Sequence, residues 1–516
     1  MTWKMNWHLT AAGGALKFPG MLPPDGPTPA GVDRRHFMKS LSVASLALGT
    51  APVAFAQAAA PRRRFAIVGC GSRHQMYQDA IEKTYPEHAQ LVALCDLNPG
   101  RVEVARQRSR KNGATPPPGY AHTDFEKMIQ ETKPDFVIVT TIDSTHDDYI
   151  VRALEAGVDV ITEKPLTNTA AKCQRVLDAT KRTGRHLRVT FNYRYSPPRT
   201  QVKDILMSGE IGDVLSVDFH WLLNTMHGAD YFRRWHSHMA ISQGLMIHKS
   251  SHHFDLVNWW LGDVPETVWA AGKREYYTPT MAKRMGLDSP HERCHTCPES
   301  AKCTFYMDLA ASPSLKELYL DQEKFDGYFR DQCVFRPSID INDTMNVMVK
   351  YRGGPTLSYS LNAFNAWEGY QIAFNGTKGR LEHTIVEQIY VNDGAGGVQG
   401  GIAANGVTTR TIPLRGAAKI HEPWTGTGGH GGGDSVMLDE IFKPDAPADK
   451  YLRASNEHAG ANSILIGVAA NQCFESGQPV RIADLVTGLE VPKYSPMPSR
   501  TAPIPMPRPL GKAATA

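Results

Sequence analysis

The sequence predicts an α/β protein with two folded domains, the first built on a doubly wound parallel sheet and the second on a large open, mostly antiparallel sheet. Three observations support this prediction. Short apolar runs alternate with helix-length segments over residues 62–187, and the first run leads directly into a glycine turn. After residue 188 the runs are longer and alternate apolar with polar residues. The 516 residues are enough for both cores.

The first domain is predicted from four apolar runs of a kind typical of buried parallel strands. Helix-length segments connect them, which gives the β-α-β-α order of a doubly wound sheet. The predicted strands span 64–68, 90–95, 136–140 and 158–161, and the predicted helices span 75–84, 99–112, 124–131 and 145–156.

The second domain is predicted over residues 188–490. Its alternating runs favour an α/β arrangement in which helices cover one face of the sheet. The tail, 491–516, is rich in proline and is expected to wrap loosely or fray. The predicted strands span 214–222, 342–351, 356–362 and 370–375, and the predicted helices span 198–207, 253–261 and 457–475.

Residues 1–61 are predicted to be a leader with a twin-arginine signal. Arg34 and Arg35 precede an apolar run over 41–55, which closes with an Ala-x-Ala cleavage pattern over 54–56. We expect export by the twin-arginine machinery into the periplasm, with no integral membrane span left after signal removal. A membrane anchor or a buried helix is the alternative, but the run is about 15 residues, not the ~20 that a span needs.

The composition excludes several classes of protein. With 41% hydrophobic and 21% charged residues, the chain is ordinary globular material rather than disordered or fibrous. Lys and Arg number 56 against 52 Asp and Glu, and several of the basic residues lie in or just after the leader. The body is therefore near neutral, and no nucleic-acid partner is expected.

A glycine turn follows the first predicted strand. Gly69 and Gly71 allow the backbone to bend tightly and approach a pyrophosphate, which the next helix N-terminus stabilises. Ser72 and Arg73 complete the predicted cofactor-binding turn. His74 stands where the fingerprint has its third glycine, so an ordinary glycine turn remains the alternative.

Asp96 ends the second predicted strand, 25 residues after Gly71. A carboxylate there can accept hydrogen bonds from both ribose hydroxyls and would repel a 2′-phosphate, which favours NAD over NADP. The alternative is an aspartate that caps the next helix. Arg73 and Arg101 are close enough in sequence to leave NADP open.

Glu163-Lys164-Pro165 follows the fourth predicted strand. Together with the glycine turn, Asp96 and the motif at 192–195, it resembles the Gfo/Idh/MocA family, which includes glucose-fructose oxidoreductase and inositol dehydrogenase. The resemblance covers about residues 62–490. It implies an N-terminal Rossmann domain and a C-terminal domain whose open sheet often forms a homo-oligomer interface. Further residues predicted to bind the cofactor are Thr140, His146, Glu163 and Lys164.

Lys164 is the predicted catalytic residue, as in the family that the chain resembles. A lysine at the carboxyl end of a parallel strand faces the crevice where the nicotinamide lies. Desolvation and the cationic ring can lower its pKa there, so that it shares a proton with a substrate hydroxyl. A solvated surface lysine is the alternative.

A second cluster lies at residues 244–255. The family pattern is Asp, then His four residues on, then Asp three further, and the matching positions are His248, His252 and Asp255. His252 matches the catalytic histidine, and His248 replaces an aspartate. We expect His248 to contact substrate or to act with His252 as an acid/base pair. A zinc site with His253 or Asp255 is a further alternative, although His253 is better explained as a core residue.

Several other residues are candidates for the substrate pocket. The segments 421–424 and 429–434 combine flexible backbone, polar side chains and an aromatic ring, which suits sugar hydroxyls and apolar sugar faces. A polar surface loop is the alternative. The predicted substrate residues, besides Lys164, His248 and His252, are Tyr193, Arg194, Trp235, Trp424 and His430.

Four of the eight cysteines gather in one region of the sequence: Cys294, Cys297, Cys303 and Cys333. A C-x2-C pair with two further cysteines is typical of a structural zinc site, and two disulfides are the alternative in an oxidising compartment. Proteins exported in folded form can take up a metal in the cytoplasm, and the tight chelate loop of the C-x2-C pair favours zinc or another structural metal.

Export constrains the expected reaction. The periplasm is not expected to hold free NAD, so an exported enzyme that released NADH at each turnover would stop. We therefore expect a tightly held cofactor in an NAD(P)-dependent oxidoreductase that acts on the CH–OH groups of a sugar or sugar-like polyol. Two alternatives remain: an NAD-dependent glycosidase working by transient oxidation and elimination, and a non-catalytic exported sugar-binding protein.

Overall fold

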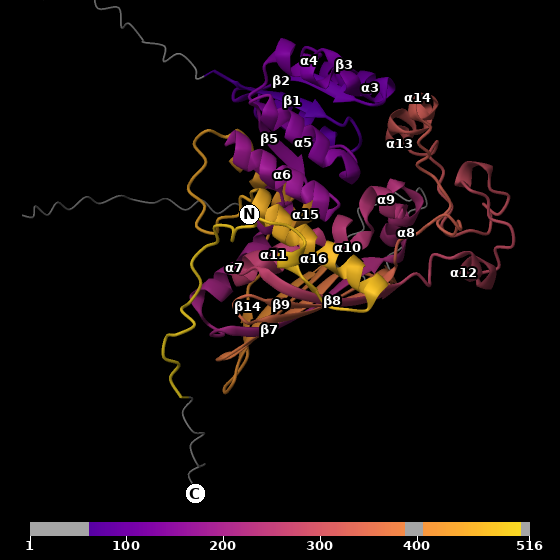
Figure 1. The fold of residues 1–516 in the computed structure, drawn as a ribbon. Helices are drawn as coiled ribbons and strands as arrows, with labels where there is room; N and C mark the ends of the chain where they lie inside the picture. The colour runs from indigo at the N-terminus through magenta and orange to yellow at the C-terminus, as the bar shows by residue number, and fades with distance from the viewer. Residues whose placement is uncertain (1–60, 388–405, 507–516) are drawn as a thin grey trace, which may run out of the picture. The chain divides into compact units, whose positions relative to one another are not determined.

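The computed structural model describes residues 61–387 and 406–506 (Figure 1). The predicted twin-arginine signal lies outside these residues. Among the described residues, no helix combines the length and the apolar composition that crossing a membrane requires.

The first sheet has six parallel strands in the order β3-β2-β1-β4-β5-β6. This confirms the predicted doubly wound sheet. Buried apolar side chains fill both faces of β1, as the apolar runs indicate. The strands are β1 (Arg63–Val68), β2 (Ala89–Asp96), β3 (Gly119–Ala121), β4 (Phe136–Val139), β5 (Asp159–Glu163) and β6 (Leu187–Thr190).

Two helices of this domain, α3 and α6, begin at capping side chains. Asn98 caps α3 by accepting hydrogen bonds from two backbone N–H groups, and Pro99 occupies the first helical position. Thr169 caps α6, which ends at Gly184 in a left-handed conformation. The helices are α2 (His74–Asp79), continued by a π-helical turn over Ala80–Thr84, α3 (Pro99–Lys111), α4 (Phe125–Thr132), α5 (His146–Glu155) and α6 (Ala170–Thr183).

The second sheet has nine strands in the order β14-β13-β12-β11-β7-β10-β9-β8-β15. Only β7 and β10 pair in parallel in the described sheet, so the predicted mostly antiparallel sheet is confirmed. The strands are β7 (Val214–Asn224), β8 (Pro265–Lys273), β9 (Thr344–Tyr351), β10 (Thr356–Asn365), β11 (Glu368–Gly376), β12 (Gly379–Glu387), β13 (Gly406–Pro413), β14 (Lys419–His421) and β15 (Val480–Arg481).

Helices cover one face of this sheet, as Figure 1 shows for α11 and α16 above β8 and β9. Along β9, buried residues alternate with exposed ones, which is the pattern of a sheet with one covered face. The helices are α7 (Pro197–Ser208), α8 (Thr225–Arg233), α9 (Met239–Ser242), α10 (Leu245–His248), α11 (Ser251–Leu261), α15 (Gly429–Phe442) and α16 (Glu457–Ser476).

The described part of the tail wraps over the second domain, the first of the two expected outcomes, and does not fray there. Tyr494 and Ser495 pack into the domain, and the Ser495 hydroxyl donates to the Lys450 carbonyl oxygen at 2.9 Å. Met497 contacts Lys203, whose ammonium donates to the carbonyl oxygen of Trp259 at 2.7 Å. The tail has apolar side chains to bury, so its proline content alone did not predict its packing.

A long insert over residues 274–343 joins β8 to β9, and the sequence did not predict its structure. It contains short helices rather than strands. They are α12 (Pro279–Arg284), α13 (Pro313–Leu318) and α14 (Glu323–Asp326), with 3-10 turns at Cys294–Thr296 and Leu320–Gln322. In Figure 1, α13 and α14 lie beside α3 of the first domain.

Candidate active site

The glycine turn after β1 has the geometry expected of a phosphate-binding turn. Gly69 has a φ of +94°, and a methyl group there would lie 2.6 Å from the Thr140 carbonyl carbon. The Thr140 hydroxyl donates to the Gly69 carbonyl oxygen at 2.6 Å, which fixes the turn against the end of β4. A methyl group at Gly71 would meet nothing within 4 Å, so this side of the turn is open to a ligand.

Asp96 lies at the end of β2, beside this turn. Its carboxylate accepts the backbone N–H of Cys70 at 2.5 Å and that of Asn98 at 2.7 Å. Burial raises the pKa of Asp96, and these two hydrogen bonds oppose the rise. Asp96 therefore ties the glycine turn to the start of α3 and stands where a ribose would be bound.

His74 stands where the fingerprint has its third glycine, and its side chain packs against the glycine turn. The imidazole is fully buried, with Nδ1 against the Gly71 carbonyl oxygen and Nε2 3.2 Å from Gln78 Oε1. Burial lowers the pKa of His74 to about 4, so the ring is neutral at physiological pH. His74 is a packing residue at this position.

The arginines near the cofactor site are paired with carboxylates of the protein. Arg73 Nε lies 2.7 Å from Glu163 Oε1, and Arg73 Nη2 lies 3.4 Å from Asp434 Oδ1. Arg101 Nη1 lies 2.7 Å from Asp326 Oδ2, with both side chains largely buried. Arg101 Nη2 is buried and has no hydrogen-bond partner among the described residues, so these ion pairs do not occupy every donor of the two guanidinium groups.

His146 holds the turn that carries Lys164. Its Nδ1 lies 2.8 Å from the Pro165 carbonyl oxygen and its Nε2 lies 3.1 Å from the Thr141 carbonyl oxygen. The Lys164–Pro165 peptide bond is cis. His146 is predicted to bind cofactor, and in the structure both of its nitrogens already face backbone carbonyls.

Lys164 points from the end of β5 toward α10. Its ammonium donates to the His248 carbonyl oxygen at 2.9 Å, and Nζ lies 3.4 Å from His248 Nε2. Burial lowers the pKa of Lys164, and the nearby Asp143 carboxylate opposes that shift. The amine is therefore closer to its neutral, proton-accepting form than a surface lysine.

Asp143 is a residue of this site that the sequence did not predict. It lies in the turn Asp143–Thr145 between β4 and α5, and its Oδ2 is 2.7 Å from His248 Nδ1. Burial raises the pKa of Asp143, and the Lys164 charge opposes the rise. The family pattern has a carboxylate at position 248. In this chain Asp143, in the turn between β4 and α5, supplies a carboxylate next to His248.

His252, Tyr193 and His430 come together on the other side of Lys164. The His252 ring stacks on Tyr193 at a centroid distance of 4.2 Å, and His430 lies 6.2 Å from His252. His252 Nδ1 is buried and has no hydrogen-bond partner within the described ranges. Burial and the Lys164 charge hold the pKa of His252 well below its usual value. A buried polar nitrogen of this kind is suited to a polar ligand.

Trp235 and Lys249 border the same cluster. The Trp235 ring lies edge-on to His248 at 5.4 Å and stacks on His236 at 3.6 Å. Lys249, which the sequence did not single out, is buried with Nζ 4.6 Å from the Trp221 ring centroid. The buried Lys249 adds positive charge beside His252, which further favours a neutral imidazole.

Arg194 was predicted to contact substrate, but in the structure it pairs with Asp255. Its guanidinium forms two hydrogen bonds with Asp255, at 2.7 and 2.6 Å, and both side chains are only 1% exposed. It therefore fixes α11 in place instead of facing a substrate. His253 is a core residue, as predicted, because it stacks on Trp221 at 4.1 Å and its Nδ1 lies 2.7 Å from the Tyr359 hydroxyl.

Trp424 is not brought into the cluster. Its indole is 39% exposed, and within the described chain it makes no ring contact with Tyr193, His252 or His430. Its backbone N–H donates to Gln201 Oε1 at 3.1 Å. The segment 421–424 therefore differs from the segment 429–434, whose His430 belongs to the cluster.

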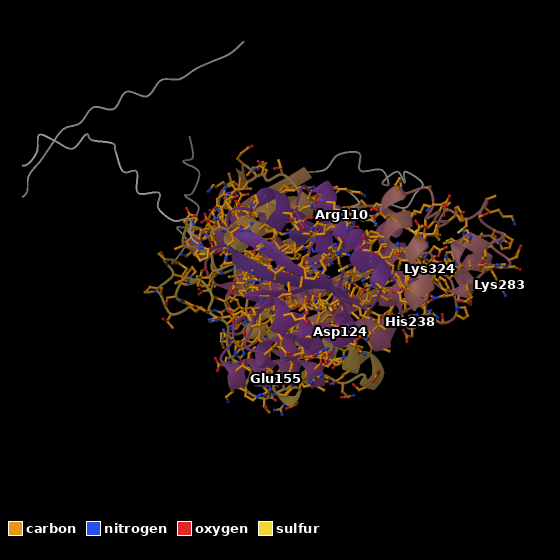
Figure 2. The ribbon with its side chains drawn as sticks, turned by 90° about the horizontal axis from the view of Figure 1, so that it is seen from above. Arg110, Asp124, Glu155, His238, Lys283 and Lys324 are labelled. Atoms are coloured by element: carbon orange, nitrogen blue, oxygen red, sulfur yellow. The ribbon has the colours of Figure 1, made fainter. Side chains whose placement is uncertain are left out.

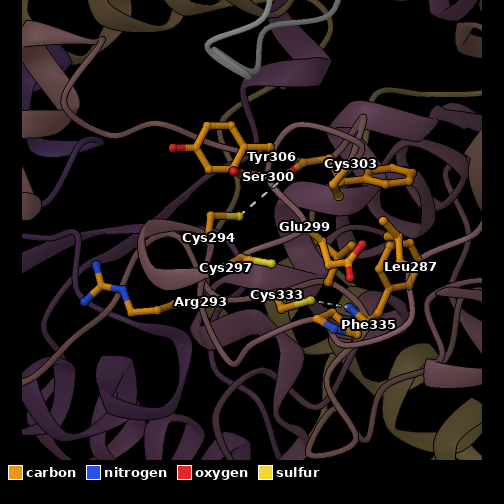
Figure 3. Close-up of a pocket in the computed structure, with 13 residues that line it drawn as sticks. Leu287, Arg293, Cys294, Cys297, Glu299, Ser300, Cys303, Tyr306, Cys333 and Phe335 are labelled. Carbon is orange, nitrogen blue, oxygen red and sulfur yellow. Dashed lines mark hydrogen bonds between the residues drawn. The ribbon is translucent and has the colours of Figure 1, made fainter. Parts of the chain in front are cut away.

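The four clustered cysteines line one small cavity of about 20 Å³ (Figure 3). Phe335 N–H donates to Cys333 Sγ at 3.4 Å, and Arg233 Nη1 lies 3.7 Å from Cys294 Sγ. All four are free thiols. Across the described residues, no group of three or more His, Cys, Asp and Glu side chains is arranged to hold a metal ion, so the structure does not support the predicted zinc sites.

The open glycine turn, Asp96 and the partly buried Lys164 indicate an oxidoreductase of the dinucleotide-binding Rossmann class. The chain belongs to the Gfo/Idh/MocA oxidoreductase family. Residues 63–191 match its NAD-binding Rossmann fold, and residues 203–482 match its C-terminal alpha/beta domain.

Several proteins are similar to this chain. A Bacillus subtilis protein assigned as an oxidoreductase, YteT, is 35% identical over 429 residues, which are 81% of this chain and 98% of YteT. Inositol 2-dehydrogenase of Salmonella typhimurium is 31% identical over 184 residues, which are 35% of this chain and 49% of that enzyme. The structure of aldose-aldose oxidoreductase from Caulobacter crescentus, complexed with glycerol, shares the fold: its TM-score is 0.54 at 18% identity, covering 82% of this chain and 100% of that one.

Proposed function

We propose that this oxidoreductase uses NAD to oxidise a hydroxyl of a sugar or sugar-like polyol and keeps the cofactor bound between turnovers. The observation that carries the proposal is the partly buried amine of Lys164, which contacts His248 and whose charge acts on the neutral imidazole of His252. The names of two similar proteins, inositol 2-dehydrogenase and aldose-aldose oxidoreductase, support a polyol or a sugar as substrate.

The residues at the glycine turn fit a dinucleotide. Gly69 and Gly71 leave the backbone open to a pyrophosphate, and Asp96 is placed for the ribose hydroxyls. NAD is favoured over NADP because the Asp96 carboxylate at the end of β2 would repel a 2′-phosphate. When bound, the nicotinamide supplies the acceptor for the hydride that leaves the substrate carbon.

A proton path follows from the contacts of Lys164. An ammonium at Lys164 can give a proton to His248 Nε2, while the proton on Nδ1 passes to Asp143 Oδ2. This transfer turns an ammonium and a carboxylate into a neutral amine and a carboxylic acid, so no net charge is buried. The neutral amine then accepts the substrate hydroxyl proton.

His252 is proposed to orient the same hydroxyl. Its ring is held by stacking on Tyr193, and its buried Nδ1 has no partner among the described residues. Because its pKa lies well below the usual value, the imidazole stays neutral and can take part in hydrogen bonding as one donor and one acceptor.

We further propose that the protein acts in the periplasm after twin-arginine export and that it forms a homo-oligomer through the second sheet. Support for the oligomer comes from the sheet face that the described helices do not cover. Trp269 on β8 pairs in register with Met348 on β9, and these side chains are 44% and 56% exposed. Large apolar side chains exposed side by side are typical of an association surface.

The test is to purify the mature protein, release its nucleotide by denaturation and identify it. Sugars, polyols and aryl glycosides are then added to the intact protein while absorbance is followed at the reduced-nicotinamide band. Reduction of bound NAD by a free sugar or polyol is expected. Release of an aglycone without a net change in absorbance at that band would instead indicate the glycosidase. Failure to bind any dinucleotide would contradict the proposal.

A further inference from the structure

Part of the insert crosses the proposed cofactor site. Residues 313–326, which we call the strap, comprise α13, the 3-10 turn Leu320–Gln322 and α14. They belong to the chain between β8 and β9 of the second domain, yet they contact the first domain at α3 and at the glycine turn. Figure 2 marks the strap with Lys324 and the adjacent α3 with Arg110.

The strap meets the glycine turn at a backbone amide that a phosphate would use. Ser72, directly after Gly71, donates its N–H to the Tyr319 hydroxyl at 3.2 Å. Amides of this turn are the donors that bind a pyrophosphate. A phenol hydroxyl both accepts and donates, so Tyr319 can accept from Ser72 and donate to a phosphate oxygen at the same time.

The strap also covers the chain that follows Asp96. Asn98 Nδ2 donates to the Gln322 carbonyl oxygen at 3.0 Å. At Gly100 an added methyl group would collide with Gln322 and Phe325, so the absence of a side chain permits the close approach. The strap thus contacts both ends of the region in which the pyrophosphate and the ribose are expected.

The largely buried ion pair of Arg101 and Asp326 locks the strap to the first domain, next to the exposed pair of Lys111 and Glu317. Arg101 Nη1 and Asp326 Oδ2 are 2.7 Å apart, and their side chains are 11% and 7% exposed. The Arg101 guanidinium also lies over the Tyr319 ring, 5.6 Å from its centroid. At the other side, Arg293 beside Cys294 holds Glu323 of the strap at 2.7 Å, which anchors it to the insert.

We propose that the strap retains the dinucleotide, with Tyr319 as a direct contact to the pyrophosphate and Arg101–Asp326 as the lock. This inference rests on the proposed function and deepens it, because it names the element that turns NAD from an exchanging cosubstrate into a held group. A ligand beneath a closed strap leaves only when the lock opens, so removing the lock raises the dissociation rate.

The test measures how fast bound NAD leaves the purified full-length holoenzyme after dilution into a large excess of a nucleotide scavenger. Asp326→Asn removes the carboxylate of the lock, and Tyr319→Phe removes only the hydroxyl. Asp321→Asn is the matched control, because Asp321 lies in the same strap and pairs with Lys316 at an exposed site. Thermal unfolding verifies that each variant is folded.

Asp326→Asn and Tyr319→Phe are each expected to raise the NAD dissociation rate by about ten-fold or more. Losing one charge-assisted hydrogen bond, or one hydrogen bond to the pyrophosphate, has an effect of about this size. Asp321→Asn should keep the wild-type rate. Wild-type rates in both test variants, or tighter binding in Tyr319→Phe, would overturn the strap while leaving NAD binding intact. Absence of NAD binding in the wild type would instead overturn the proposed function, and the strap with it.

Discussion

Asp143 gives Lys164 and His248 a carboxylate that the local sequence around His248 lacks. It is 105 residues away along the chain, in the turn between β4 and α5. Asp143 and His248 lie on different elements and are in contact in the fold, so an acidic group lies beside the proposed catalytic amine.

Asp143→Asn should therefore lower kcat by about 100-fold, because the amide cannot take up the proton that His248 passes on. The Asp143 charge raises the pKa of Lys164, so its removal should also move the rising limb of the pH–rate profile, on which Lys164 loses its proton, to lower pH. A pH–rate profile measures both effects.

Asp148→Asn is the control for this change, since Asp148 is an exposed residue of α5 paired with Arg152. It should leave both kcat and the profile unchanged. A slow Asp143→Asn enzyme whose profile does not move would show that Asp143 acts only through folding.

Among the elements, the turn between β1 and α2 tolerates no side chain at its first glycine. Gly69→Ala should abolish NAD binding, because a methyl group would meet the Thr140 backbone at 2.6 Å in addition to the strain of a positive φ. Gly113→Ala is the control: its φ is +78°, but a methyl group there meets nothing within 4 Å. Both changes share a strain of about 1–2 kcal/mol, so calorimetric NAD titration of the two variants isolates the clash. Equal NAD affinity in both would contradict this account of the turn.

Helix α11 is held by the buried pair of Arg194 and Asp255. Asp255→Asn leaves the guanidinium buried without its counter-charge and should reduce the free energy of unfolding by about 3–5 kcal/mol. Glu155→Gln breaks the exposed pair with Arg182 and should change the free energy of unfolding by less than about 1 kcal/mol. Denaturant titration compares the two, and equal effects would show that Arg194 is not a structural residue.

These elements also show what a sequence can predict. Four of the six strands of the first sheet and the glycine turn follow from local patterns, since each is set by neighbours along the chain, whereas β3 and β6 were not predicted. Asp143 and the strap could not be predicted in this way, because their roles arise from contacts between distant segments. Arg194 was misassigned because a charged side chain next to a predicted site residue can pair inside the core, and only the fold reveals its partner Asp255.

At the scale of the whole molecule, the proposed homo-oligomer uses the uncovered face of the second sheet, where Trp269 and Met348 are exposed. Met348→Glu places a charge beside Trp269 and should shift the protein toward smaller species in sedimentation. Met285→Glu changes another exposed methionine, 41% exposed after α12, and should leave the assembly unchanged. An unchanged sedimentation coefficient in Met348→Glu would place the interface elsewhere.

The proposed reaction depends on Lys164. Its amine accepts the proton of the substrate hydroxyl, and the carbon of that hydroxyl gives hydride to the retained NAD. The most direct measurement is single-turnover reduction of the bound nucleotide as a function of pH, in the wild type and in Lys164→Ala. Only the neutral amine accepts a proton, so the wild-type rate should rise with pH through a midpoint well below 10.5, the ordinary pKa of lysine. Lys164→Ala should keep its NAD and lose this pH-dependent reduction. Reduction at the wild-type rate in Lys164→Ala would contradict the account.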